Sequence, residues 1–292
     1  MSVVLITGCS SGFGLAGALA FARAGDIVYA SMRRLSKANG LVEAAAREGL
    51  TVRPIELDVT KPVTYAAVIQ KILSESQRLD VLVNNAGILR AGAFEDLDET
   101  ALRDVLETNF FAPFLLTRAV LPQMRRQGSG YIIMISSLSG VAGLPGDVAY
   151  TASKFAVEGA TEALRHEVDR WGIKLALVEA ALYATRIFDA SASPDSAMPA
   201  DYPADSPYRT LIETQLAALR DRLPQALDPA IVANLLVQIS RSDGRQLRWP
   251  ADAVAKKVLA TLFGQDDATR DAFLRDVAGT QWWSAGHSAP AR

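Results

Sequence analysis

The stretch Val3-Val-Leu-Ile6, followed by Thr7-Gly-Cys-Ser-Ser-Gly-Phe-Gly14, decides the fold of this chain. A short apolar run rich in β-branched residues is typical of a strand buried on both faces of a parallel sheet. The Ala- and Leu-rich pattern from Leu15 to Arg23 then predicts a helix. The glycines between them permit a tight turn, and they let backbone approach a diphosphate at the helix N-terminus, where free N–H groups point outward. The spacing is G-x-x-x-G-x-G rather than the commoner G-x-G-x-x-G, but its place between strand and helix indicates a nucleotide site.

Predicted strands alternate with predicted helices along the rest of the chain. Apolar runs predict strands at 3–6, 27–31, 52–57, 80–84, 131–136, 174–179 and 246–249. Helical periodicity predicts helices near 13–24, 36–48, 62–77, 99–126, 148–171, 229–240 and 252–263. This alternation predicts an α/β fold, a doubly wound and mostly parallel sheet with right-handed crossovers and helices on both faces. Since half of the 292 residues are hydrophobic, we expect 1–292 to form one such domain.

Tyr150 and Lys154 stand four residues apart in a predicted helix, and Ser137 lies thirteen residues before Tyr150. Positions i and i+4 share one helix face, so the phenol and the ammonium would project side by side. A free tyrosine has a pKa near ~10, and a nearby cation favours its ionised form. Ser137 could then polarise a carbonyl while Tyr150 transfers a proton to its oxygen. Such a pair alone is more often solvated helix surface, so this interpretation depends on the preceding strand and on the glycine loop.

Together these motifs resemble the short-chain dehydrogenase/reductase family. The matching segments are Thr7 to Gly14, Leu57-Asp-Val59, Asn84-Asn-Ala-Gly87, Asn109, Ile135-Ser-Ser137 and Tyr150-Thr-Ala-Ser-Lys154. The resemblance implies a Rossmann-like fold and a nicotinamide-dependent oxidoreductase that acts on an alcohol/carbonyl pair. It places the catalytic group on Asn109, Ser137, Tyr150 and Lys154, with Asn109 holding a water that links Lys154 to solvent. It places cofactor contacts on Gly8, Ser10, Ser11, Gly12, Phe13, Gly14, Arg33, Arg34, Asp58, Val59, Asn85, Ala86, Gly87, Tyr150, Lys154 and Thr185.

The residues after the second predicted strand, Ser31-Met-Arg-Arg34, indicate which cofactor is preferred. An acidic residue there would accept from the ribose 2′-hydroxyl of NAD(H), whereas an arginine can meet a 2′-phosphate. Met32 takes the acidic position and Arg33 follows it, so NADP(H) is favoured over NAD(H). Solvated loop cations are the alternative interpretation of Arg33 and Arg34. Asp58 is similar to the family's adenine-contacting aspartate, although Asp-Val-Thr could equally begin the next helix.

Asn109 lies inside a long predicted helix. Because asparagine favours caps over helix interiors, it indicates a kink or a water site.

After the sixth predicted strand the family usually has Pro-Gly, whereas this chain has Ala180-Ala181. Alanine is poor at any positive φ that glycine would supply, so we expect a reshaped loop beside the nicotinamide. Thr185 still matches the family's threonine near the carboxamide.

Residues 186–224 are expected to form a substrate lid. Residues 189–207 hold four prolines and many small residues, and the run Leu211 to Leu219 has apolar residues at helical spacing. An inert linker, or a segment packed permanently on the body, is the alternative. The apolar residues near the expected cleft indicate an apolar ketone, aldehyde or secondary alcohol as substrate. They are Phe94, Leu144, Tyr183, Ile187 and Phe188.

Bulk properties exclude several classes of protein. A net charge of −2 with interspersed signs indicates neither nucleic acid nor an anionic membrane as a partner. No apolar stretch reaches the ~20 residues of a membrane span, and no signal peptide is predicted, so we expect a cytoplasmic protein. A single cysteine, Cys9, excludes an internal disulfide framework, and we interpret it as a filler residue. The two histidines, His166 and His287, lie far apart, and no metal site is predicted.

Three readings of the function stay open on sequence alone. Reduction of a ketone or aldehyde by NADP(H) is favoured. An imine reductase or epimerase would use the same fold, and a non-catalytic NADP(H)-binding regulator would lack a catalytic residue, whereas none is lost here. The Ala- and Leu-rich helices around Asn109 and Tyr150 predict pairing into a homodimer or homotetramer, as is common in the family. The branch of the family that contains steroid and retinoid dehydrogenases looks similar in Gly8-Cys-Ser-Ser-Gly12 and Met32-Arg-Arg34, and bacterial ketoreductases share those features.

Overall fold

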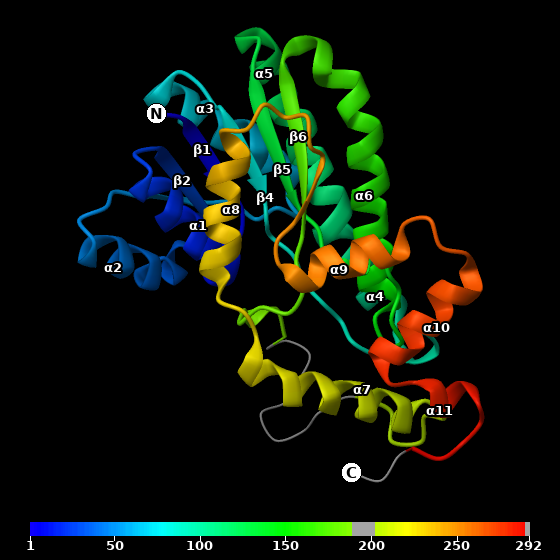
Figure 1. The fold of residues 1–292 in the computed structure, drawn as a ribbon. Coiled ribbons are helices and arrows are strands. Elements are labelled where there is room, and N and C mark those ends of the chain that lie inside the picture. Colours follow the sequence, from blue (N-terminus) through cyan, green and yellow to red (C-terminus); the bar gives the residue numbers. More distant parts are fainter. Residues whose placement is uncertain (189–201, 290–292) are drawn as a thin grey trace.

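A computed structural model describes residues 1–188 and 202–289, and within them a seven-stranded parallel sheet carries helices on both faces (Figure 1). The strands run in the order β3-β2-β1-β4-β5-β6-β7. They are β1 Val3–Ile6, β2 Ile27–Met32, β3 Arg53–Glu56, β4 Val81–Asn84, β5 Gly130–Ile135, β6 Ile173–Glu179 and β7 Arg248–Pro250. The order reverses between β1 and β4, which opens a crevice at the carboxyl ends of these strands. The predicted doubly wound α/β fold is confirmed.

The helices divide between the two faces of the sheet. Their bounds are α1 Gly12–Arg23, α2 Asn39–Arg47, α3 Tyr65–Ser76, α4 Glu99–Leu106, α5 Ala112–Gln127, α6 Val148–Val168, α7 Arg209–Arg222, α8 Pro229–Ser240, α9 Ala253–Leu262, α10 Asp267–Ala278 and α11 Gln281–Ser284. Buried residues of α1, α2 and α8 form the core on one face. Those of α3, α5 and α6 form the core on the other face. The strands between them are therefore buried on both sides, as their continuous apolar runs predict.

The predicted helix 99–126 is divided into three parts. A π-helix at Glu107–Phe111 separates α4 from α5, and Asn109 lies buried within it. Local π turns widen a helix and are frequent at functional sites. The expected irregularity at Asn109 is therefore present, as a π turn rather than as a kink.

Helices α10 and α11 were not predicted. Helix α10 is rich in charged residues, and only Ala278 within it is buried, so its apolar periodicity is weak. Its ends do carry sequence signals. Asp266 caps the N-terminus by accepting from the Thr269 N–H at 2.8 Å, and Gly279 ends the helix with φ at 62°.

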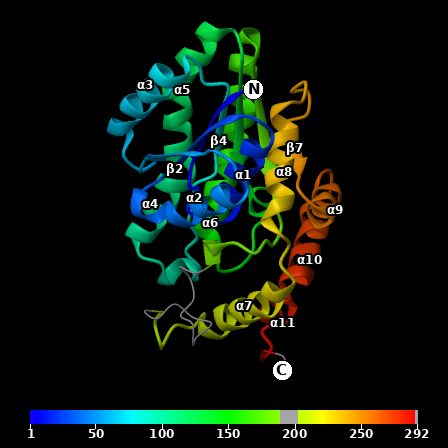
Figure 2. The same cartoon turned by 90° about the vertical axis from the view of Figure 1, so that its left-hand side faces the viewer.

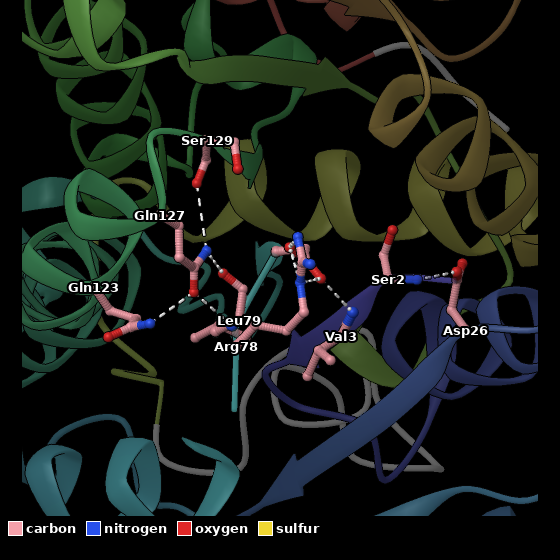
Figure 3. Close-up of polar contacts among 9 residues, drawn as sticks. Ser2, Val3, Asp26, Arg78, Leu79, Gln123, Gln127 and Ser129 are labelled. Atoms are coloured by element: carbon pink, nitrogen blue, oxygen red, sulfur yellow. Dashed lines mark hydrogen bonds and ion pairs between the residues drawn. The ribbon is translucent and has the colours of Figure 1, made fainter. Parts of the chain in front are cut away.

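Carboxylate and amide side chains form hydrogen bonds to backbone groups at the amino ends of the strands (Figure 3). Asp80 accepts from the Val3 N–H at 2.8 Å and is held by Arg78. Gln127 accepts from the Leu79 N–H and donates to the Leu79 carbonyl, each at 3.0 Å. These polar groups satisfy backbone at the end of the sheet away from the crevice, so their role is structural.

Helix α7 lies across the carboxyl end of the sheet and alongside α11 in both views (Figures 1 and 2). A bond from Gln215 Nε2 to the Ala278 carbonyl, 2.8 Å long, ties α7 to the end of α10. Residues 189–201 of the expected lid lie outside the described residues. Among the helices of the described ranges, none is long and apolar enough to cross a membrane.

Candidate functional site

The glycine loop packs too closely for larger residues. A Cβ on Gly14 would lie 2.4 Å from the Gly8 carbonyl oxygen, and Gly8 and Gly12 have φ of +75° and +55°. Glycine is therefore required at all three positions for the loop to join β1 to α1. Cys9 is buried behind the loop with its thiol on the Ile6 carbonyl, at 3.2 Å, which agrees with its interpretation as a filler residue.

The same loop presents free donors. In the described part of the chain, the backbone N–H groups of residues 10–14 have no acceptor, and Ser11, the N-cap of α1, makes no side-chain cap bond. Ser10 is exposed, and Ser11 and Phe13 are half-buried. Unsatisfied N–H groups at a helix N-terminus favour an anion, so this cradle fits the diphosphate of a dinucleotide.

Beyond β2, the two arginines and the methionine have different surroundings. Arg33 and Arg34 are exposed, whereas Met32 is 3% exposed and belongs to the core. The methionine therefore fills the position of an acidic ribose ligand with an apolar core side chain. The charges of Lys61 and then of Arg33 contribute to the lowered pKa of the Asp58 carboxyl.

Asp58 stabilises a turn rather than a helix. Its Oδ1 accepts from the Thr60 N–H at 3.1 Å and from the Thr60 hydroxyl at 2.8 Å. Burial alone would raise the pKa of Asp58, but these bonds and the nearby cations hold it below its ordinary value. The residue is not an N-cap, because the next helical turn begins at Pro62. The Val59 carbonyl accepts from the Tyr65 hydroxyl, at 2.5 Å.

Thr7 joins the glycine loop to the segment after β4. Its hydroxyl accepts from the N–H groups of Asn85 and Ala86, at 2.9 and 3.0 Å. Asn85 Nδ2 in turn donates to the Thr7 carbonyl at 2.7 Å. The asparagine side chain therefore has a structural partner. Ala86 packs against the glycine loop, since a Cβ on Gly8 would meet it at 3.0 Å, and a Cβ on Gly87 would meet Asn109 Oδ1 at 3.3 Å.

Ser137, Tyr150 and Lys154 lie together at the carboxyl end of β5. Ser137 follows the strand and accepts from the Ser139 N–H at 3.1 Å. Helix α6 places Tyr150 and Lys154 on its inner face, 8% and 5% exposed. Lys154 Nζ donates to the Ile135 carbonyl at 2.7 Å and lies 5.6 Å from the centroid of the Tyr150 ring. The strand end and the helix face thus bring the three predicted side chains into one group, in which Tyr150 and Lys154 are buried and Ser137 is half-buried.

The electrostatics of this group differ from the expectation. Burial raises the pKa of Tyr150 to about 12, while the Ser137 hydroxyl lowers it and Asp147 raises it, both by less. Burial also lowers the pKa of Lys154 to about 8, against the opposing effect of Glu158. Burial therefore sets the direction of the tyrosine pKa, opposite to the expected one, because desolvation outweighs the effect of the Ser137 hydroxyl. Tyr150 keeps its proton at neutral pH.

The Asn109 side chain is hydrogen-bonded within the protein through both its oxygen and its nitrogen. Its Oδ1 accepts from the Ile88 N–H at 2.9 Å, and its Nδ2 donates to the Ile88 carbonyl at 2.9 Å and to Ser153 Oγ at 3.0 Å. The amide therefore fixes the segment after β4 against α6. Both N–H groups of the amide are used in these bonds, whereas Oδ1 accepts one of the two bonds that it can accept, so a water held by this residue stays a prediction.

Ala180 and Ala181, which follow β6 where the family usually has Pro-Gly, show no backbone strain. Among the described residues other than glycine, Gln77 alone has positive φ, so Ala180 and Ala181 need none. Asp252 accepts from the Ala181 N–H at 3.2 Å and from the Tyr183 hydroxyl at 3.0 Å. Tyr183 is buried in the core, so its expected place in a substrate cleft is wrong. Thr185 lies against the glycine loop, 3.3 Å from where a Gly12 Cβ would be.

A cavity of about 730 Å³ lies on the outer face of α6. Leu144, Val148 and Phe155 line it together with Leu274 and Trp283 from the C-terminal helices. On an α-helix, positions 148 and 155 point away from 150 and 154. The cavity walls do not include Ser137 or Tyr150, so this hollow is separate from the buried group.

Sequence reasoning missed Glu158, Glu179 and Arg248, a cluster of ionisable groups from α6, β6 and β7 in which the two glutamates are buried and the arginine is half-buried. Arg248 Nε donates to Glu158 at 2.9 Å and lies 4.0 Å from Glu179. Burial, and then the charge of Glu158, raise the pKa of Glu179 to about 8. The four-residue spacing of Lys154 and Glu158 on α6 was the available signal, but no pattern points to Arg248.

Known proteins resemble this chain over most of its length. The short chain dehydrogenase family profile matches residues 2–195. An uncharacterized oxidoreductase of Bacillus subtilis, YusZ, is 36% identical over 263 residues, covering 89% of this chain and 91% of the relative. The 17-beta-hydroxysteroid dehydrogenase type 1 of Mus musculus is 35% identical over 255 residues, covering 85% and 73%. A solved short-chain dehydrogenase from Streptomyces avermitilis has a TM-score of 0.74 at 33% identity and covers 98% of this chain and 97% of that chain. The chain therefore belongs to the short-chain dehydrogenase family of oxidoreductases.

Proposed function

We propose that this oxidoreductase uses NADP(H) to transfer hydride to or from an apolar ketone, aldehyde or secondary alcohol. The observation that carries the proposal is the buried group of Ser137, Tyr150 and Lys154, which lies at the same end of the sheet as the glycine loop. Residues 10–14 would hold the diphosphate, and Lys154 would hold the nicotinamide ribose. Bound NADPH would supply the hydride.

The protein supplies the proton and the geometry. Ser137 and Tyr150 would donate hydrogen bonds to the carbonyl oxygen, which makes the carbon more electrophilic. As the carbon gains hydride, the Tyr150 phenol gives its proton to the oxygen. A phenol with a pKa of about 12 is protonated at every physiological pH and is therefore ready for reduction. The Lys154 charge would then stabilise the phenolate that remains.

Two observations support the finer choices. The exposed Arg33 beside a buried Met32 leaves a cation, and no carboxylate, directly after β2, which suits a 2′-phosphate. For the substrate, the relative from Mus musculus bears the name of a hydroxysteroid dehydrogenase, which supports an apolar substrate.

A panel of substrates tests the reaction class. Consumption of NADPH and of NADH would be measured in parallel with ketones, aldehydes and imines, and alcohols would be tested with the oxidised cofactors. Turnover of ketones or aldehydes, faster with NADPH, is expected. Turnover of imines alone, or cofactor binding with no turnover of any compound, would replace the proposal with one of the other two readings.

We also propose that residues 186–224 act as a substrate lid. Asp96 Oδ2 accepts from the hydroxyls of Tyr202 and Ser206, the latter at 2.7 Å, and these bonds hold the arm that leads into α7. On α7, Ile212 packs on the loop between Ser137 and Tyr150, since a Cβ on Gly146 would lie 3.1 Å from Ile212 Cδ1. The arm and α7 thus cover the loop that joins the two reacting residues.

Asp96→Ala is expected to raise KM for bulky apolar substrates about tenfold, because two bonds to a charged acceptor are lost and the lid opens. KM for small ketones should change little. Asp104→Ala, which removes an exposed carboxylate of α4, is the matched control. An equal rise in KM for small and bulky substrates, or a large fall in Tm, would show that the segment is structural.

We further propose that the protein is a homodimer or homotetramer paired through α5 and α6. Phe111 and Phe155 are 48% and 44% exposed on neighbouring segments there. Light scattering at micromolar concentration should give an oligomer. Phe155→Glu should weaken association at least about 30-fold, as expected for a central apolar contact, whereas Val254→Glu on α9 should not. A monomeric wild-type protein would contradict this.

A further inference from the structure

Helix α6 carries a second charged residue one turn beyond Lys154. Glu158 follows at four-residue spacing, so it lies on the same inner face. It is 4% exposed, whereas Glu162, one turn further, has a side chain that is 55% exposed. A buried carboxylate is unfavourable unless it is paired and hydrogen-bonded, so the contacts of Glu158 need an explanation.

Glu158 connects the edge of the sheet to the turn that carries Ser137. Its Oε1 accepts from the Ser136 hydroxyl at 2.5 Å, and its Oε2 accepts from Arg248 Nε at 2.9 Å. The 3₁₀ turn Leu138–Gly140 rests directly on it, because a Cβ on Gly140 would lie 2.9 Å from Glu158 Cγ. The Glu158 side chain is therefore bonded to Arg248 of β7 on one side, and on the other side it packs against the turn that follows Ser137.

Glu158 is the buried carboxyl of the cluster that is both hydrogen-bonded and ion-paired. Arg248 also donates to Glu162, at 2.8 Å. The Glu179 carboxyl, fully buried on β6, has no hydrogen-bond partner at normal distance among the described residues, and burial raises its pKa to about 8, which favours its protonated form at neutral pH. Burial also raises the pKa of Glu158, but the bonds from Ser136 and Arg248 oppose this.

Lys154 Nζ donates to the Ile135 carbonyl and Glu158 accepts from the hydroxyl of the next residue, Ser136, so the ammonium and the carboxylate lie beside successive residues at the end of β5. Burial lowers the pKa of Lys154 to about 8, and Glu158 is the one charged group that opposes it among the described residues. The other groups nearby are the neutral Tyr150 and the Asp147 carboxyl, which acts on the phenol. Without Glu158, burial alone would decide the charge of the lysine.

We propose that Glu158 is a positioning residue for this site: anchored by Arg248, its carboxylate keeps Lys154 positively charged and seats the turn that carries Ser137. The inference rests on the proposed function, in which Lys154 and Ser137 serve the reaction. It adds a link from the edge strand β7, about 90 residues away in sequence from α6, to the reacting pair.

The pH profile of kcat/KM for carbonyl reduction tests the proposal. In Glu158→Gln the protonated lysine loses its anion, so its pKa falls and the loss of activity at high pH begins about one unit lower. Activity near pH 6 should be close to wild type, and activity at pH 9 about tenfold lower than wild type. Glu162→Gln also removes a carboxylate from Arg248 but should not shift the profile. Glu179→Gln replaces a protonated carboxyl and should leave the profile below pH 8 unchanged.

A second measurement does not depend on turnover. The chain has seven lysines, so a titration of protein labelled with [ε-¹³C]lysine, followed by NMR, can report the pKa of Lys154, assigned with Lys154→Arg. A pKa lowered in Glu158→Gln and unchanged in Glu162→Gln supports the proposal even if the panel finds no substrate. If wild-type protein reduces carbonyls but Glu158→Gln shifts neither the profile nor the lysine titration, or if Glu162→Gln shifts them equally, the proposal is overturned.

Should Glu158→Gln not fold, Glu158→Asp decides the matter. It keeps the charge but withdraws the carboxylate from Ser136 by one methylene. The Lys154 titration should then stay near wild type while kcat falls at every pH, because the serine turn loses its support. Wild-type kcat together with a wild-type profile in this variant would overturn the proposal.

Discussion

Tyr150→Phe should bind NADPH normally and reduce carbonyls roughly 10²–10⁴ times more slowly than wild type, the usual contribution of a general acid. The phenol is 8% exposed, and the Ser137 hydroxyl acts on it. Phenylalanine preserves the shape of the ring and removes only the proton. Single-turnover and steady-state kinetics would measure the rate of reduction, and NADPH fluorescence would measure cofactor binding separately.

Tyr131→Phe is the matched control, because it removes another largely buried phenol, at the start of β5, whose hydroxyl contacts Ser242 Oγ at 3.0 Å. Its activity should stay within a few-fold of wild type. If Tyr150→Phe kept more than a tenth of wild-type kcat, Tyr150 would not be the proton donor, and the proposed mechanism would need another acid.

Arg33→Ala should raise KM for NADPH about 10- to 100-fold and leave KM for NADH nearly unchanged. A hydrogen-bonded cation–phosphate pair contributes about 1.5–3 kcal/mol, and each 1.4 kcal/mol is tenfold. The 2′-phosphate is present in one cofactor only, so the ratio of kcat/KM for the two cofactors isolates the contact. Met32 is unsuitable for this test, because its side chain is in the core.

Arg34→Ala, which removes the adjacent exposed cation, provides the comparison for Arg33→Ala. A smaller change in the cofactor ratio is expected there. If both variants lowered kcat/KM for NADPH and NADH by the same factor, the arginines would act on general affinity, and the assignment of NADP(H) would fail.

Much of the fold could be predicted because its signals are local. Val3 to Ile6 is buried on both faces of the sheet, so the whole strand is apolar, and the glycines that follow mark the turn from strand to helix, where Gly14 packs on the nearby Gly8 carbonyl. The grouping of Ser137, Tyr150 and Lys154 also depends on local geometry, since a strand end and one helix face bring them together.

The features that sequence reasoning missed depend on contacts between distant segments. Burial of Tyr150 and Lys154 is set by the packing of α6, and it reversed the expected direction of the tyrosine pKa. The bond between Glu158 and Arg248 joins residues 90 positions apart, which no periodicity records. The π turn at Asn109 is fixed by its bonds to Ile88, on another segment.

The buried Glu179 also makes folding a proton-binding reaction. This carboxyl has an ordinary pKa of 4.5, which applies to the unfolded chain, and a pKa of about 8 in the fold. Below pH 4.5 both states hold the proton, and between pH 4.5 and 8 only the folded state does. As the pH rises from 4.5 to 8, the contribution of this group to the free energy of unfolding therefore falls by up to about 1.4 kcal/mol for each pH unit. This one side chain therefore makes the folded state more stable in mildly acidic solution than in alkaline solution.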